Sequence, residues 1–101
     1  MNQLNGKGQK HGSWEEMGSY LISNGEYLNG KKNGTWIGYF HNQITYISTY
    51  VNNIKNGEYI DYHLNINLNI RSKGQYLNNR KIGLWEYFKL DNVLKDKHFY
   101  L

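Results

Sequence analysis

Residues 27–39 read YLNGKKNGTWIGY, and this stretch decides the fold. A tyrosine with an aliphatic neighbour is followed by an Asn-Gly pair, which suits a two-residue hairpin turn, and then by Gly34 and Trp36. The stretch therefore predicts the end of one strand, a tight turn and the start of the next strand.

The same pattern returns along the whole chain. A glycine followed two residues later by a large aromatic residue occurs four times, with the glycines 22, 23 and 26 residues apart, at Gly12-Ser13-Trp14, Gly34-Thr35-Trp36, Gly57-Glu58-Tyr59 and Gly83-Leu84-Trp85. A second column, a tyrosine followed by an aliphatic residue, keeps this register at Tyr27, Tyr50, Tyr76 and Tyr100. Such a period indicates stacked supersecondary units. We therefore predict one repeat domain, residues 1–101, with units at approximately 4–27, 28–50, 51–76 and 77–101.

Composition favours strands over helices. The 101 residues include 10 Tyr, 3 Trp and 3 Phe, with no Pro and no Ala. Aromatic and β-branched side chains fit a pleated sheet better than a helix. We predict an all-β fold, a single antiparallel meander of about eight strands that is built from four β-hairpins and curved into a trough. A closed barrel is the alternative.

Turn signals separate the predicted strands. Between units we expect tight turns at Asn29-Gly30, Asn52-Asn53 and Asn78-Asn79. Within units we expect turns at Asn24-Gly25, His41-Asn42-Gln43 and Asp91-Asn92. Aliphatic residues and Asn alternate from Leu64 to Ile70, which predicts a strand there.

The charge balance is basic. Twelve Lys and Arg against eight Asp and Glu give a net charge of +4, and residues 51–101 hold eight cations and five acids. This excess favours an anionic partner. The absence of Cys excludes a disulfide framework and a thiolate metal site. Without an apolar stretch of the kind that signal peptides and membrane spans require, we expect a cytoplasmic protein of a bacterium or of a phage-infected host cell.

Residues 27–39 resemble the MORN repeat (membrane occupation and recognition nexus) in its longer bacterial variant, whose signature is roughly Y-x-N-G-K-x-x-G-x-W-x-x-Y. Four units cover essentially the whole chain. The second matches strongly and the fourth well, whereas Met17 replaces a tyrosine in the first and Tyr59 replaces the tryptophan in the third. The resemblance implies a curved β-hairpin array used for binding. Bacterial members are often described as antitoxin- or immunity-like, and eukaryotic members scaffold proteins or lie at membranes; membership alone names no ligand.

Nothing in the sequence indicates catalysis. The four histidines stand at −1, +7, +6 and +15 from the glycine of their unit, at His11, His41, His63 and His98. A metal site needs three or four converging ligands, and a catalytic histidine needs a partner within reach. No serine lies in a nucleophile-elbow pattern. We expect no enzymatic activity, no metal and no cofactor.

One column is basic in every unit. Two residues before the repeated glycine stand Lys10, Lys32, Lys55 and Lys81, and Lys31 and Arg80 adjoin this column. If the units stack in register, two strands separate successive lysines by about 10 Å. Two interpretations stay open. These lysines suit exposed turns and protect sheet edges, or they form a cationic row that binds a ligand.

The aromatic residues form two further columns. Trp14, Trp36, Tyr59 and Trp85 are each followed three residues later by Met17, Tyr39, Tyr62 and Phe88, and this odd separation places the two columns on opposite faces unless a bulge intervenes. We assign to the core of the stacked units Trp14, Trp36, Tyr59, Trp85, Tyr27, Tyr50 and Tyr76. We assign to the contact surface Tyr39, Tyr62, Tyr20 and Tyr46. Rings exposed beside lysines suit a nucleotide, and they also suit a protein partner.

Two functions follow from these columns. The first is a non-enzymatic protein that sequesters an anionic small molecule, a nucleotide, as a phage-type anti-defence sponge for a nucleotide messenger of host immunity. The alternative is an antitoxin or immunity protein that neutralises a toxin or effector protein by direct contact. The net charge of +4 fits an acidic toxin better than a nuclease with a basic channel. A role at lipid surfaces ranks last, and a homo-oligomer would cover the exposed aromatic column.

Overall fold

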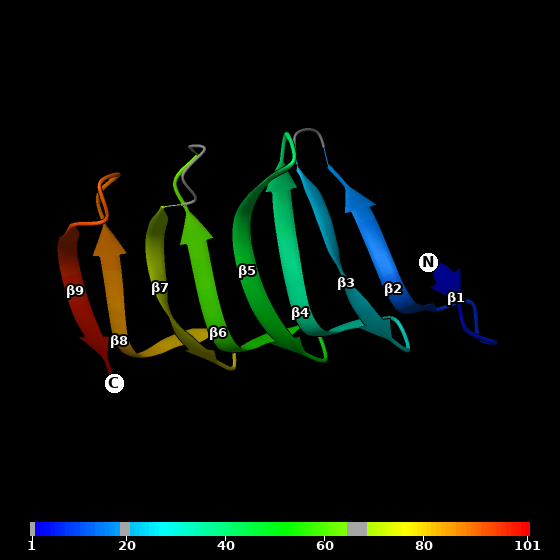
Figure 1. The fold of residues 1–101 in the computed structure, drawn as a ribbon. Coiled ribbons are helices and arrows are strands. Elements are labelled where there is room, and N and C mark those ends of the chain that lie inside the picture. Colours follow the sequence, from blue (N-terminus) through cyan, green and yellow to red (C-terminus); the bar gives the residue numbers. More distant parts are fainter. Residues whose placement is uncertain (1, 19–20, 65–68) are drawn as a thin grey trace.

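Nine antiparallel strands form one sheet in the computed structural model, which describes residues 2–18, 21–64 and 69–101. The strands lie side by side in the order of the sequence (Figure 1). Their bounds are β1 Gln3–Leu4, β2 Lys10–Met17, β3 Ile22–Leu28, β4 Lys31–Phe40, β5 Gln43–Val51, β6 Ile54–Tyr62, β7 Ile70–Leu77, β8 Arg80–Phe88 and β9 Leu94–Tyr100. No helix occurs in these three ranges, and β1 and β9 do not pair. The predicted open meander is confirmed, and the closed barrel is wrong.

Three tight turns join β3 to β4, β5 to β6 and β7 to β8. We call β2, β4, β6 and β8 the outgoing strands, and β3, β5, β7 and β9 the return strands. Both residues of each turn have positive φ, with values of 50° and 84° at Asn29-Gly30, 50° and 70° at Asn52-Asn53, and 51° and 67° at Asn78-Asn79. Asparagine and glycine tolerate this region better than other residues do. The three turns predicted between units are confirmed, as are those at His41-Asn42 and Asp91-Asn92.

The prediction of a turn at Asn24-Gly25 is wrong. Both residues lie inside β3, and the connection between β2 and β3 precedes Ile22. Glycine is required at position 25 because the ring of Trp36 covers it, so that an added Cβ would overlap the ring. Residues 65–68 of the predicted strand from Leu64 to Ile70 lie outside the described residues, and β7 begins at Ile70.

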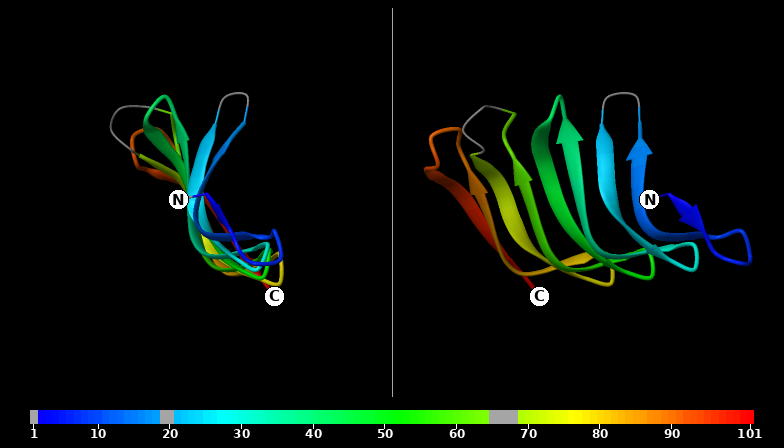
Figure 2. Two further views of the ribbon diagram at one scale, coloured as in Figure 1. Left: turned by 90° about the vertical axis from the view of Figure 1, so that its right-hand side faces the viewer. Right: turned by 45° about the vertical axis from the view of Figure 1, so that its right-hand side comes forward.

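The sheet is bent across its strands, as the left panel of Figure 2 shows. The four repeated glycines have positive φ values of 78°, 83°, 112° and 66°, at Gly12, Gly34, Gly57 and Gly83. In a straight strand, four residues would separate the Cα atoms of Lys32 and Trp36 by about 13 Å. The Lys32 Nζ nevertheless lies 4.6 Å from the centroid of the Trp36 ring. Both side chains are therefore on the inside of the bend, and we call this the inner face of the sheet and the opposite one the outer face.

The aromatic columns pack into two clusters of rings on the inner face. Trp36 and Trp85 are 0% and 1% exposed, although the sheet is a single layer. Tyr27 lies edge-on between Trp14 and Trp36, with ring centroids 5.7 and 5.2 Å away. Tyr76 lies in the same way between Tyr59 and Trp85, at 5.5 and 5.2 Å. Each unit therefore buries the aromatic rings of its neighbour.

Hydrogen bonds from the turns join successive units. The Asn53 backbone N–H donates to the Lys32 carbonyl oxygen at 2.9 Å, and the Asn53 Oδ1 accepts from the Lys32 backbone N–H at 2.7 Å. Asn79 makes the same pair of bonds to Lys55, at 3.0 and 2.8 Å. At the first turn Gly30 supplies only the backbone bond, to the Lys10 carbonyl oxygen at 2.8 Å.

Candidate functional site

The four lysines of the basic column lie in one line on the inner face. Each return-strand tyrosine is directly opposite the lysine of the following outgoing strand, in the pairs Tyr27 with Lys32, Tyr50 with Lys55 and Tyr76 with Lys81. Each tyrosine ring also lies beneath the lysine of the preceding outgoing strand, with the Nζ atom 5.0, 5.3 and 4.9 Å from the ring centroid. Lysines and tyrosines therefore alternate along the sheet.

Every lysine of this line also covers the aromatic ring four residues further along its own strand. The distances from Nζ to the ring centroid are 5.0, 4.6, 5.3 and 4.6 Å, for Lys10 over Trp14, Lys32 over Trp36, Lys55 over Tyr59 and Lys81 over Trp85. Cation–π attraction holds each ammonium group at a fixed place above two rings. The sequence showed both columns, but only the bend at the glycine between them brings them into contact.

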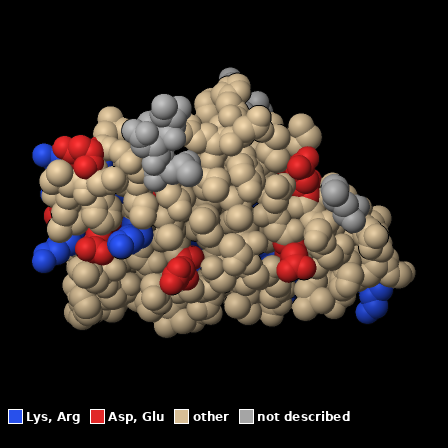
Figure 3. Space-filling view, viewed as in Figure 1, with Lys and Arg blue, Asp and Glu red and all other residues tan. Residues whose placement is uncertain are grey.

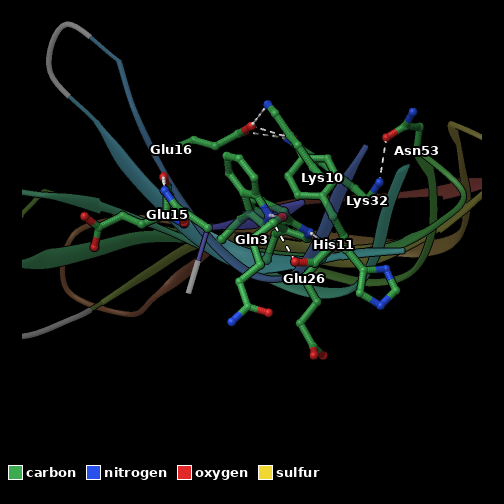
Figure 4. A network of polar contacts seen from close by, with 12 residues as sticks. Gln3, Lys10, His11, Glu15, Glu16, Glu26, Lys32 and Asn53 are labelled. Atoms are coloured by element: carbon green, nitrogen blue, oxygen red, sulfur yellow. Dashed lines mark hydrogen bonds and ion pairs between the residues drawn. The ribbon is translucent and has the colours of Figure 1, made fainter. Parts of the chain in front are cut away.

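In the N-terminal half of the inner face, Glu16 neutralises the lysines (Figure 4). Its Oε2 accepts a hydrogen bond from the Lys10 Nζ at 3.0 Å and another from the Tyr27 hydroxyl, and its Oε1 lies 3.8 Å from the Lys32 Nζ. Burial raises the pKa of Glu16, but the bonds from Tyr27 and Lys10 and the lysine charges outweigh it, so the pKa is below its ordinary value. Burial and the Glu16 carboxylate raise the pKa of Tyr27.

The C-terminal half has no such carboxylate. Two residues beyond Tyr59 stands Asp61, which is 7% exposed and occupies the position that Glu16 holds relative to Trp14. The Asp61 carboxylate binds the Arg71 guanidinium, with Nη2 at 3.0 Å, and the Ser72 hydroxyl at 2.7 Å. No carboxylate in the described ranges forms an ion pair with Lys55 or Lys81. This half of the inner face therefore keeps an excess of positive charge.

Three β-bulges turn additional side chains to the inner face. The extra residue stands in the return strand each time, as Thr45 in β5, Arg71 in β7 and Lys95 in β9. A bulge interrupts the alternation of side chains, so that two successive residues point to the same face. Arg71 and Ser72 both reach Asp61 on the inner face for this reason. No sequence pattern indicates these bulges, and neither Arg71 nor Lys95 belongs to the repeated columns.

A groove of about 380 Å³ opens between these bulges at the C-terminal end of the inner face. Three cations and one acid line it, which leaves two net positive charges, and the full set is Asp61, His63, Arg71, Ser72, Lys81, Tyr87, Phe88 and Lys95. The Lys81 Nζ donates to the Tyr87 hydroxyl at 3.2 Å. Burial lowers the pKa of Lys81, but the bond to Tyr87 and the electrostatic interactions with Tyr87, Tyr100 and Tyr76 together outweigh it and raise the pKa above its usual value. Lys81 therefore stays charged.

Asp61 holds Arg71 in place at the wall of the groove. The Arg71 Nε and Nη2 lie 3.3 and 3.0 Å from the two Asp61 carboxylate oxygens. The hydrogen bond and charge of Asp61 raise the pKa of Arg71 further. The Arg71 side chain is 61% exposed, so its remaining N–H groups face the solvent. A fixed guanidinium with free donors is suited to an anionic oxygen.

The predicted site residues do not all come together. Lys31 and Arg80 adjoin Lys32 and Lys81 in their strands, so alternation turns them to the outer face. Tyr39 and Tyr62 pair with Ile22 and Ile70, on the face opposite the lysines. The expectation of Tyr39 and Tyr62 beside the lysine column is therefore wrong.

Tyr46 alone among the predicted contact tyrosines of the described ranges lies on the inner face. Its ring covers Gly38, and its hydroxyl lies 2.9 Å from the Ser23 hydroxyl. Tyr20 lies outside the described residues. The rings that contact the lysines are instead those assigned to the core, together with Tyr87 and Tyr100 above Trp85.

The histidines occupy unrelated positions. His41 lies in an exposed turn, His98 packs on Tyr100 with ring centroids 4.3 Å apart, and the His63 Nε2 lies 2.8 Å from the Phe88 carbonyl oxygen at the groove. In the described ranges no three His, Asp or Glu side chains gather closely enough to hold a metal ion.

Figure 3 shows cations and acidic groups together at the end formed by β8 and β9, separate acidic groups across the rest of this face, and a further cation at the opposite end, near β1. The described part of the chain contains no helix long and apolar enough to cross a membrane.

No family model, curated protein or solved structure matches the chain. The resemblance to the MORN repeat therefore rests on the sequence pattern alone.

Proposed function

We propose that the protein is a non-enzymatic binding protein that sequesters an anionic small molecule, a nucleotide, in the groove at the C-terminal end of the inner face. The convergence of Arg71, Lys81 and Lys95 around one groove carries this proposal. The only acid in the groove lining, Asp61, is already paired with Arg71 and Ser72. An incoming phosphate would meet cations and would not have to displace a carboxylate.

The chemistry of the groove suits phosphate. An arginine whose orientation is fixed loses little conformational freedom when it binds an anion, and its planar donors match phosphate oxygens. Lys81 and Lys95 add two point charges to the lining. The ring of His63 in the lining offers a surface on which a base can stack. A volume of about 380 Å³ lies in the range of small-molecule sites, about 300–1,000 Å³.

Isothermal titration calorimetry with cyclic dinucleotides, cyclic trinucleotides and ADP-ribose derivatives tests the proposal. At least one of these ligands is expected to bind, and Arg71→Gln and Lys95→Gln should each weaken it by about tenfold. Arg80→Gln and Lys97→Gln remove the same charges from the outer face and serve as matched controls. Uniformly absent heat across the panel, or equal effects of both pairs of variants, would overturn the proposal.

A protein partner is the second candidate, favoured by the outer face. Ile37, Ile47 and Ile60 are directly opposite one another on three successive strands, and no second layer in the described ranges covers them. Such an apolar row suits contact with a toxin. If a neighbouring gene encodes a toxin domain, co-purification that is abolished by Ile47→Asp and kept by Arg71→Gln would support this function against the first.

A further inference from the structure

The carboxylate of Glu16 is bound by side chains that stand at repeated positions of the sequence. Lys10 and Lys32, from two successive outgoing strands, flank it, and the Tyr27 hydroxyl from the return strand between them donates to it. We call this combination of two lysines and the intervening tyrosine an anion seat. In the first unit the chain itself supplies the anion.

The same combination recurs twice along the inner face. Tyr50 pairs with Lys55 in register and lies with its ring centroid 5.3 Å from the Lys32 Nζ. Tyr76 pairs with Lys81 and lies with its ring centroid 4.9 Å from the Lys55 Nζ. The second seat is therefore formed by Lys32, Tyr50 and Lys55, and the third by Lys55, Tyr76 and Lys81.

Among the residues that the structure describes, none supplies an acid to either of these two seats. The residue that corresponds to Glu16 in the second unit is Gly38, which has no side chain. In the third unit it is Asp61, whose shorter side chain binds Arg71 and Ser72. The contacts of Glu16 therefore indicate that this arrangement of two lysines and a tyrosine can bind an anion. The later units have the same arrangement without the carboxylate.

We propose that the second and third seats bind anionic groups of a ligand, and that Glu16 is a built-in occupant that closes the first seat. Cation–π contacts with the rings below hold each ammonium group in position. Binding therefore requires little ordering of the long lysine side chains.

The seats define the class of ligand. Equivalent seats are two strands apart, which is about 10 Å. Lys81 belongs both to the third seat and to the groove, so the two are continuous. A ligand with several phosphates could occupy the groove and the third seat together. This class includes dinucleotides and dinucleoside polyphosphates, and this last step rests on the proposed function.

A titration followed by amide NMR, with inorganic tripolyphosphate as the probe, tests the seats one by one. In the unmodified protein, the amides of Tyr50, Lys55 and Tyr76 should shift and saturate, while those of Lys10 and Tyr27, which belong to the first seat only, stay unchanged. Glu16→Gln should open the first seat, so that Lys10 and Tyr27 also shift, with an affinity within about tenfold of the other seats.

The matched control is Glu15→Gln, since Glu15 carries the same charge on the adjacent, outer-facing position. In this control variant, the amides of Lys10 and Tyr27 should not shift. Equal responses of the Glu15 and Glu16 variants would overturn the proposal, because a general rise in positive charge would then explain them.

The groove and the seats can fail separately in this experiment. Shifts at Tyr50 and Tyr76 that survive Arg71→Gln and Lys95→Gln, without shifts at His63 or Tyr87, would support the seats and count against the groove. Shifts confined to His63, Tyr87 and Lys95 would overturn the seats and leave the proposed function standing. Silence throughout would overturn both.

Discussion

The indole of Trp36 lies directly on Gly25 of the preceding strand, and its Nε1–H donates to the carbonyl oxygen of the next residue, Glu26, at 3.1 Å. Trp85 repeats this arrangement on Gly74, with a bond to the Gln75 carbonyl oxygen at 3.0 Å. A ring can be fully buried in a single-layer sheet only if backbone without a side chain forms its floor. The glycine and the tryptophan therefore work as one packing unit.

Gly25→Ala and Gly74→Ala are expected to destabilise the protein severely. The added Cβ of each variant would overlap an indole ring that cannot move without losing its hydrogen bond and its burial. Overpacking of this kind costs about 3 kcal/mol. Urea unfolding measures the loss, and Gly6→Ala, at a site with nothing within 4 Å of the new Cβ, should change stability little. A loss at Gly25 no larger than that at Gly6 would refute this account of the packing.

In the third unit a tyrosine replaces the tryptophan of this pair, and a serine replaces the glycine. Tyr59 is opposite Ser48, which is 2% exposed. The smaller tyrosine leaves room for the serine side chain, whereas an indole would collide with it. Tyr59→Trp should therefore destabilise the protein alone and be tolerated together with Ser48→Gly. We expect a favourable coupling of about 1–2 kcal/mol in a double-mutant cycle, and additive effects would contradict it.

Asn53 has two separable tasks, because its φ is 70° and its Oδ1 accepts from the Lys32 backbone N–H. Asn53→Gly keeps the conformational tolerance and loses the side-chain bond, as at Gly30, and should cost about 1 kcal/mol. Asn53→Ala loses both and should cost about 1 kcal/mol more. Thermal unfolding of the two variants separates these contributions. If the glycine variant matches the original protein, the side-chain bond contributes nothing.

Acid should weaken the fold through Glu16. Its pKa in the folded state is below the ordinary value of 4.5, so its contribution is complete above that value and is lost as the pH falls through the lower, folded-state pKa. Because the group is partly exposed, the contribution is modest, about 1 kcal/mol. Stability measured from about pH 6 to 3 should fall less steeply in Glu16→Gln than in Glu15→Gln. Parallel curves for the two variants would count against the ion pairs.

Much of the fold was predictable because the same turn and strand residues recur at the same positions in successive units. Asn52-Asn53 and Asn78-Asn79 recur at the same place in their units, and positive φ follows from the chemistry of asparagine. The strand order then follows from the shortness of the turns. The turn predicted at Asn24-Gly25 was wrong because an Asn-Gly pair suits a turn, whereas glycine also suits a strand position that an aromatic ring covers. The packing partner of Gly25, Trp36, is eleven residues away in sequence and on another strand.

The candidate site was only partly predictable. Alignment of the lysine column follows from the repeat, but its contact with the rings depends on the bend at glycines such as Gly34. Arg71 and Lys95 were missed because β-bulges direct them to the inner face, and a bulge depends on pairing between strands. Tyr39 and Tyr62 obey simple alternation, which places them away from the lysines.

The glycine beneath each buried indole belongs to an earlier strand. Gly25 of β3 lies beneath Trp36, and Gly74 of β7 lies beneath Trp85. A ribosome releases the sheet in that same sequence, so Trp36 and Trp85 each emerge after the strand that supports them. Truncation from the carboxyl end would leave the remaining indoles supported, whereas removal of the first hairpin would strip Trp36 of its support. The architecture is thus directional, and its assembly can proceed in step with synthesis.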